Sequence, residues 1–175
     1  MEIREPNPFF ESAALNGAGL ALAASLVLYG SMLILPGFSG IIFGCLGCCG
    51  LLFAPGLVTV RQHIAAYGEN IELGRGSVIG FTAGLVFGIV FNFMEVVWGF
   101  FGINTAALFL DTITAFIEEH GDPEALDNIE EMRRQQEESG FSVFGLLFSV
   151  VIMGTVNLIS GMAGTAIFKK KEGAL

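Results

Sequence analysis

The chain has 175 residues, of which 53% are hydrophobic and 14% are charged, and its mean hydropathy is +0.70. Because soluble domains usually carry about 25% charged residues, this composition excludes an ordinary soluble protein. The formal net charge is −9 and the only basic cluster is Lys169–Lys171, so nothing favours nucleic-acid binding. The sequence therefore predicts an integral membrane protein in a lipid bilayer.

The N-terminal third predicts two membrane-spanning helices. Residues 13–60 contain no charged side chain. A helix needs roughly 20 apolar residues to cross a bilayer, so this stretch is long enough for two spans. We place the spans near 13–35 and 38–60, with a tight turn at Pro36-Gly37. The preceding leader carries three glutamates and one arginine, so we expect no removable signal peptide.

Two later apolar stretches, 79–101 and 141–168, predict a third and a fourth span. The fourth exceeds the length needed for a bilayer core of about 30 Å, which predicts a tilted helix or an end that protrudes into water. We therefore expect an all-α, polytopic membrane protein that forms one domain over residues 1–175. Its four transmembrane helices would carry an amphipathic and acidic helical insertion, 104–140, between the third and the fourth.

This insertion contains ten of the seventeen acidic residues. Apolar residues recur at helical spacing in its first half and predict an amphipathic helix. The sequence Asp122-Pro123-Glu124 predicts the start of a second helix. Residues 118–122 combine three carboxylates with His120, but EF-hand spacing is absent. We interpret them as a solvated helix end, with weak divalent-cation binding as the alternative.

Lysine and arginine are unevenly divided between the two sides of the predicted membrane domain. Four spans place both chain ends and the loop 61–77 on one side, which holds Arg4, Arg61, Arg75, Lys169, Lys170 and Lys171. The insertion on the other side holds only Arg133 and Arg134. Since basic flanks are retained in the cytoplasm, this bias predicts that both termini are cytoplasmic.

Small residues repeat at helical spacing along the predicted spans. Helices in lipid associate where small side chains let their backbones approach closely. The candidate helix-packing residues are Gly40, Gly44 and Cys48 in the second span, Gly80, Gly84 and Gly88 in the third, and Gly154 and Gly161 in the fourth. These residues predict a tightly packed bundle.

All three cysteines, Cys45, Cys48 and Cys49, lie in the stretch GCLGCCG, where a helix places them on one face. A structural zinc site needs four ligands, and no second cysteine pair exists. The CxxC spacing lies within a span rather than in a βαβ unit. We interpret the cysteines as small packing residues, with reversible thiol chemistry and metal binding as alternatives.

Three polar residues, Asn92, Glu95 and Asn157, are candidates for a polar pocket between the spans. Glu95 is the only ionisable residue within a predicted span, and an intramembrane carboxylate costs about 2.5 kcal/mol or more at the bilayer centre. It lies just before Trp98, which is typical of the interfacial aromatic belt. We interpret the three residues as interhelical hydrogen-bonding groups, with a cation or proton pathway as the alternative.

Catalytic motifs are absent from the sequence. It contains no GxSxG, HExxH or phosphate-binding loop. The two histidines, His63 and His120, fall on opposite sides of the predicted membrane domain. We therefore expect no enzymatic activity, no cofactor and no bound metal.

Two stretches resemble an uncharacterised family of bacterial four-helix integral membrane proteins, which is described only as a domain of unknown function. AYGENIELGRGSVIGF, at 66–81, is similar to the loop that enters the third helix of that family, and NLISGMAGTAIFKKK, at 157–171, is similar to its last helix. The resemblance implies the four-span fold and the bacterial cytoplasmic (inner) membrane. It implies no activity and no functional residues.

Two functions are compatible with these features. The small size, the glycine repeats and the missing catalytic groups favour a structural or accessory subunit that packs against other membrane proteins or itself. The acidic insertion would then be its docking surface. The alternative is a small homo-oligomeric cation or proton channel or transporter that uses Asn92, Glu95 and Asn157. Transporters usually contain repeats or broken helices, and no internal repeat is detectable here, so we favour the accessory subunit.

Overall fold

The computed structural model describes residues 8–35, 37–67, 71–120, 123–139 and 143–168. These residues form six α-helices and no strand: α1 (Pro8–Ile34), α2 (Phe38–Tyr67), α3 (Leu73–Phe100), α4 (Thr105–His120), α5 (Pro123–Ser139) and α6 (Val143–Phe168). Four of them, α1, α2, α3 and α6, are long and apolar enough to cross a membrane. The predicted all-α fold with four spans and a helical insertion is confirmed.

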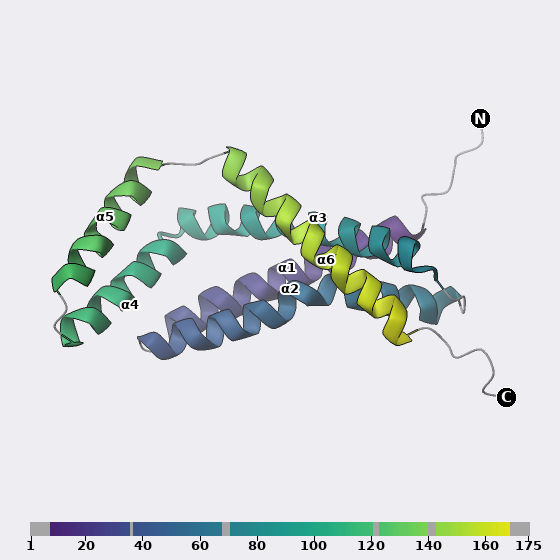
Figure 1. The fold of residues 1–175 in the computed structure, drawn as a ribbon, viewed down its shortest axis with the longest axis horizontal. Coiled ribbons are helices and arrows are strands. Elements are labelled where there is room, and N and C mark those ends of the chain that lie inside the picture. The colour runs from purple at the N-terminus through teal and green to yellow at the C-terminus, as the bar shows by residue number, and fades with distance from the viewer. Residues whose placement is uncertain (1–7, 36, 68–70, 121–122, 140–142, 169–175) are drawn as a thin grey trace.

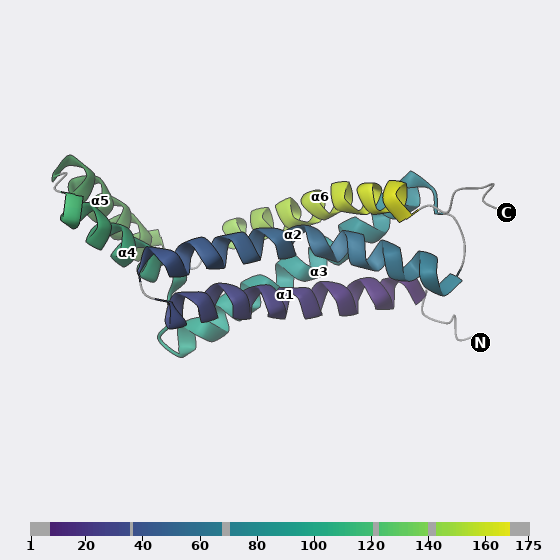
Figure 2. The ribbon, with the colours of Figure 1, turned by 90° about the horizontal axis from the view of Figure 1, so that it is seen from below.

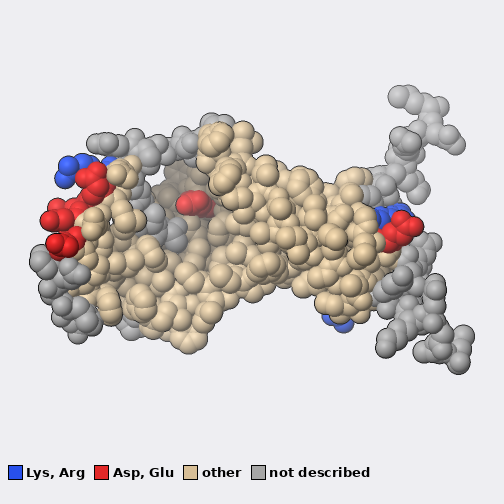
Figure 3. All heavy atoms as spheres, in the orientation of Figure 1, with Lys and Arg blue, Asp and Glu red and all other residues tan. Residues whose placement is uncertain are grey.

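The four long helices form an elongated bundle, and a hairpin made of α4 and α5 projects from one end of it (Figures 1 and 2). The opposite end contains the starts of α1 and α3 and the ends of α2 and α6. We call these the hairpin end and the termini end. In Figure 3 the charged side chains lie mostly at these two ends, and the surface between them is mainly uncharged. This distribution is that of a multi-pass membrane protein.

The long helices carry apolar side chains on their outward faces as well as in their contacts. Large exposed side chains occur on each of them, among them Leu26, Leu46, Phe93 and Val151. Such a surface would promote aggregation in water, whereas lipid chains solvate it without cost. The outward faces of the bundle therefore face a lipid bilayer.

The helices extend beyond the predicted spans at the termini end. α2 continues to Tyr67 and α3 begins at Leu73, so most of the predicted loop 61–77 is helical. In this extension Arg61 is exposed, while His63 and Ile64 are buried. A helix with polar residues on one side and packed residues on the other continues out of the bilayer without a break. His63 accordingly lies within α2 rather than in a loop.

Candidate functional site

The most extensive contact in the bundle joins α3 to α6, and glycines lie along it. A Cβ atom added at Gly84 would lie 2.5 Å from the Met153 carbonyl oxygen and 2.6 Å from Asn157 Cβ. A Cβ atom at Gly80 or at Gly161 would lie 2.9 Å from the Cα atom of the other residue. Gly88 and Gly154 lie in the same contact. Larger side chains at these positions would separate two helix backbones that now touch.

The α1–α2 contact uses small residues in the same way. A Cβ atom at Gly40 would lie 2.9 Å from the carbonyl oxygens of Ser31 and Leu35. A Cβ atom at Gly44 would lie 2.5 Å from the Ser31 hydroxyl oxygen. The two helices of the first hairpin therefore approach most closely next to the turn that connects them.

The three cysteines have different surroundings. Cys48 packs against a buried cluster of Ala21, Ala24 and Phe87, whereas Cys45 and Cys49 are exposed. All three are free thiols. Within the described part of the chain, no group of three or more His, Cys, Asp or Glu side chains is arranged to hold a metal ion. The structure thus gives Cys48 a packing position, and thiol chemistry at Cys45 and Cys49 stays an untested alternative.

A proline lies inside α2, at a buried position. Pro55 has no N–H group and cannot donate the usual helical hydrogen bond to the Leu51 carbonyl. Figure 1 shows α2 changing direction near its middle. In lipid, backbone groups freed by a proline need partners from a neighbouring helix, because water is absent.

Asn157 of α6 bonds to the α2 backbone on both sides of Pro55. Its Oδ1 accepts a 3.0 Å hydrogen bond from the Gly56 N–H, and its Nδ2 donates a 3.0 Å hydrogen bond to the Leu52 carbonyl. In a regular helix, the N–H group of residue 56 donates to the carbonyl of residue 52. The Asn157 amide therefore bonds to the donor and to the acceptor of one such pair. One turn later, the Ser160 hydroxyl donates to the Phe53 carbonyl. Both α6 side chains are buried.

The sequence alone does not reveal this arrangement. Its polar residues suggest a pocket of Asn157 with Asn92 and Glu95, and nothing in the pattern distinguishes Ser160. The available signal was the combination of a proline within one span and an amide within another, since a broken helix in lipid requires polar partners. The sequence does not say which span faces Pro55.

Asn92 belongs to a different contact between α3 and α6. Its Nδ2 donates to the Gly88 carbonyl at 2.7 Å and to the Ser149 hydroxyl oxygen at 3.2 Å. Ser149 and Asn157 are eight residues apart on α6, which corresponds to about 12 Å along the helix. Asn92 and Asn157 therefore stabilise separate levels of the bundle, with no hydrogen bond between them.

Glu95 lies one turn beyond Asn92 on α3. Its side chain is exposed, and it makes no hydrogen bond or ion pair with the described residues. Gly88, seven residues earlier and so on nearly the same side of the helix, packs against Val150 of α6. The face of α3 that α6 covers at Gly88 is thus uncovered at Glu95.

Two further polar contacts join α1 to its neighbours. Near the termini end, the Asn16 side-chain amide donates to Thr59 Oγ1 at 3.2 Å and to Gln62 Oε1 at 2.8 Å, both on α2. Toward the hairpin end, Trp98 Nε1 of α3 donates to Ser25 Oγ at 2.7 Å. These hydrogen bonds, like that of Asn157, connect pairs of long helices.

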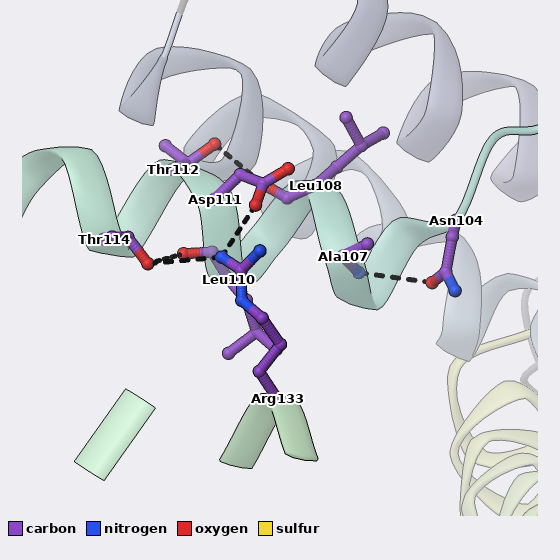
Figure 4. Close-up of polar contacts among 8 residues, drawn as sticks. All are labelled: Asn104, Ala107, Leu108, Leu110, Asp111, Thr112, Thr114 and Arg133. Atoms are coloured by element: carbon purple, nitrogen blue, oxygen red, sulfur yellow. Dashed lines mark hydrogen bonds and ion pairs between the residues drawn. The ribbon is translucent and has the colours of Figure 1, made fainter. Parts of the chain in front are cut away.

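An ion pair connects the two helices of the hairpin (Figure 4). The Arg133 guanidinium of α5 lies 2.7 Å from Asp111 Oδ1 and donates a 3.5 Å hydrogen bond to Thr114 Oγ1, both on α4. The two charged side chains are 41% and 59% exposed. At the start of α4, Asn104 Oδ1 accepts a 3.2 Å hydrogen bond from the Ala107 N–H, as a helix cap does.

The hairpin is attached to the bundle mainly through α2. The rings of Phe116 and Phe38 stack there with their centroids 5.6 Å apart. α5 begins at Pro123, as the sequence predicts. Between α4 and α5 lies an open cavity of 470 Å³ whose lining includes Glu118, Glu130 and Arg134. Apart from Glu118, the side chains of the predicted cation-binding group 118–122 lie outside the described residues.

Comparisons with known proteins add no assignment: no protein-family model, no curated protein and no solved structure matches this chain. The resemblance to a bacterial four-helix family therefore stays a prediction from sequence.

Proposed function

We propose that this protein is a non-catalytic accessory subunit that binds another membrane protein in the bacterial cytoplasmic membrane, with both termini in the cytoplasm. The observation that carries the proposal is the α4–α5 hairpin, which projects from the bundle and whose two helices are joined by the Arg133–Asp111 ion pair. This hairpin presents a charged surface beyond the membrane-spanning helices. Its excess of carboxylates suits a partner with a basic surface.

The bonding of Asn157 supports a structural role for the polar residues inside the bundle. An asparagine side chain has two N–H donors and one carbonyl acceptor. Here both donors are used, on the carbonyls of Leu52 and Met153, and the acceptor is used on the Gly56 N–H. An amide whose donors and acceptor all bond to backbone groups holds two helices together, which is a structural role.

Photo-crosslinking in the membranes of the native host tests the proposal. A photoreactive residue replaces Met132, which is exposed on α5, and in a control variant it replaces Phe43, which is exposed on α2. We expect Met132 to crosslink to one protein of constant mass and Phe43 to crosslink mainly to lipid. Mass determination in mild detergent should show a hetero-complex. A monomer or a symmetric homo-oligomer without crosslinked protein would contradict the accessory role.

A cation or proton channel or transporter is the second candidate, and the exposed carboxylate of Glu95 favours it. Asn92 lies one turn before Glu95 on α3 and donates a hydrogen bond to Ser149 of α6. Flux in proteoliposomes tests this function. Measurable flux that disappears in Glu95→Gln would replace the accessory subunit with a transporter, whereas an absence of flux from both proteins is the result that we expect.

A further inference from the structure

The exposed face of α3 around Glu95 has the features of an unoccupied helix-packing surface. Gly84, Gly88 and Glu95 share one side of α3, because they are separated by four and seven residues. α6 packs on the first two, with Met153 against Gly84 and Val150 against Gly88. Toward the hairpin end α6 diverges from α3, as both Figure 1 and Figure 2 show. The packing face therefore continues beyond the helix that covers it.

Two residues make this continuation suitable for another helix. Gly99, one turn after Glu95, has no neighbouring atom within 4 Å of an added Cβ, so a second backbone could approach it closely. Asn92 is bonded to Ser149 of α6, so the uncovered face begins after Asn92 and continues toward the hairpin end. The space-filling view shows a hollow near this end of the bundle, with an acidic side chain in it (Figure 3).

The charge of Glu95 identifies the chemistry of the occupant. Glu95 lies five residues before the end of α3 at Phe100, which is about 7.5 Å inside the helix end. At that depth a carboxylate is tolerated in the free chain, because its cost falls toward the interface. A helix that covered it would remove its water, and a cationic side chain is the partner that offsets the buried charge itself.

A second copy of this chain cannot provide such a cation within the membrane. The segments 13–60, 79–101 and 141–168 contain no lysine or arginine. We infer that the α3 face formed by Asn92, Glu95 and Gly99 binds a transmembrane helix of a different protein, and that this helix carries a lysine or arginine that pairs with Glu95. This inference rests on the proposed accessory role, and it specifies which part of the partner contacts this chain within the membrane.

Binding of synthetic transmembrane helices tests the inference directly. Trp98, the only tryptophan in the chain, lies three residues after Glu95 and serves as the fluorescence donor. The probe is a tryptophan-free leucine–alanine helix with a dansyl acceptor and one lysine about 7 Å inside its end, where it matches the depth of Glu95. The control peptide has leucine in place of the lysine. Both are added to the protein in phosphatidylcholine vesicles.

We expect the lysine peptide to quench Trp98 at a concentration at least about tenfold lower than the leucine peptide, as a close charge pair predicts. Glu95→Gln should abolish this difference, whereas Glu72→Gln, at the termini end, should preserve it. Equal quenching by the two peptides, or a preference for lysine that persists in Glu95→Gln, would overturn the inference.

A second measurement separates this inference from the proposed function. If the native hetero-complex forms and is unaffected by Glu95→Gln, the accessory role stands and the Glu95 docking face is wrong. If no hetero-complex forms, the accessory role itself fails. A homodimer that dissociates in Glu95→Gln would assign the face to self-association and would also overturn the inference.

Discussion

The α3–α6 pair and the α4–α5 pair are both contacts between two helices of one chain, but different forces stabilise them. α3 and α6 meet backbone to backbone at glycines, with Asn92 as a hydrogen-bonding residue between them. α4 and α5 meet through the Arg133–Asp111 ion pair and have buried apolar side chains such as Leu110 and Ile129. In lipid, burying leucine gains almost nothing and close approach decides association, whereas in water apolar burial and charge both contribute.

The largest expected effect comes from filling the α3–α6 contact. Gly84→Leu places a side chain where even a Cβ atom would lie 2.5 Å from the Met153 carbonyl oxygen. We expect a loss of more than about 3 kcal/mol of folding free energy, because backbone cannot move as a side chain can. Size-exclusion chromatography in detergent should show aggregated protein.

The matched control for this change is Gly50→Leu. No atom lies within 4 Å of a Cβ added at Gly50, which is exposed on α2. We expect a monodisperse protein with an unchanged or higher thermal midpoint, since leucine is the better helix former. Equal damage from both substitutions would show that glycine acts through backbone flexibility rather than through the helix contact.

Removing the amide of Asn157 should have the next largest effect. Asn157→Leu keeps the branch at Cγ but takes a hydrogen-bonding partner from the Gly56 N–H and the Leu52 carbonyl. We expect a loss of about 1–3 kcal/mol, measured as a lower thermal midpoint in detergent. Thr155→Val is the control, because Thr155 is exposed and bonds only to the Val151 carbonyl of its own helix.

A double substitution determines whether Asn157 acts on the proline break. Pro55→Ala restores an N–H group to α2 and lets the helix straighten. The cost of Asn157→Leu should then be smaller in the Pro55→Ala background than in the natural chain. If the losses of folding free energy from the two substitutions simply add, Asn157 stabilises the α2–α6 contact independently of Pro55.

Cys48→Ala tests the packing interpretation of the cysteines. Cys48 is half-buried against Ala21, Ala24 and Phe87, so the loss of one sulfur atom should cost less than about 1 kcal/mol. The thermal midpoint should fall by only a few degrees. If function disappeared while the fold persisted, the thiol would have a chemical role and the packing interpretation would be wrong.

The smallest effect is expected in the hairpin. Arg133→Gln removes an ion pair whose side chains are largely solvated, and exposed pairs contribute only about 0–1 kcal/mol. Protease cleavage within α4 and α5 should accelerate slightly, and the bundle should keep its thermal midpoint. Arg134→Gln is the control. High salt should reduce the difference between the natural chain and Arg133→Gln, because it screens exposed charges.

The membrane spans could be predicted because every spanning helix must be apolar and must satisfy its own backbone groups. The start of α5 at Pro123 was also predictable, since proline suits the first helical turn. The continuation of α2 past Val60 was not, because charged residues mark the edge of a bilayer but do not end a helix.

The sequence by itself therefore determined that there are four apolar helices, a charged helical hairpin and small residues able to form contacts. Only the tertiary structure decided which helices pair, that Asn157 bonds to the α2 backbone next to Pro55, and that Arg133 reaches Asp111. For the four long helices, the physical reason is that they carry apolar side chains on their outward faces as well as in their contacts. Hydrophobic periodicity then cannot point one face inward, and orientation depends on how small and polar residues of distant segments fit together.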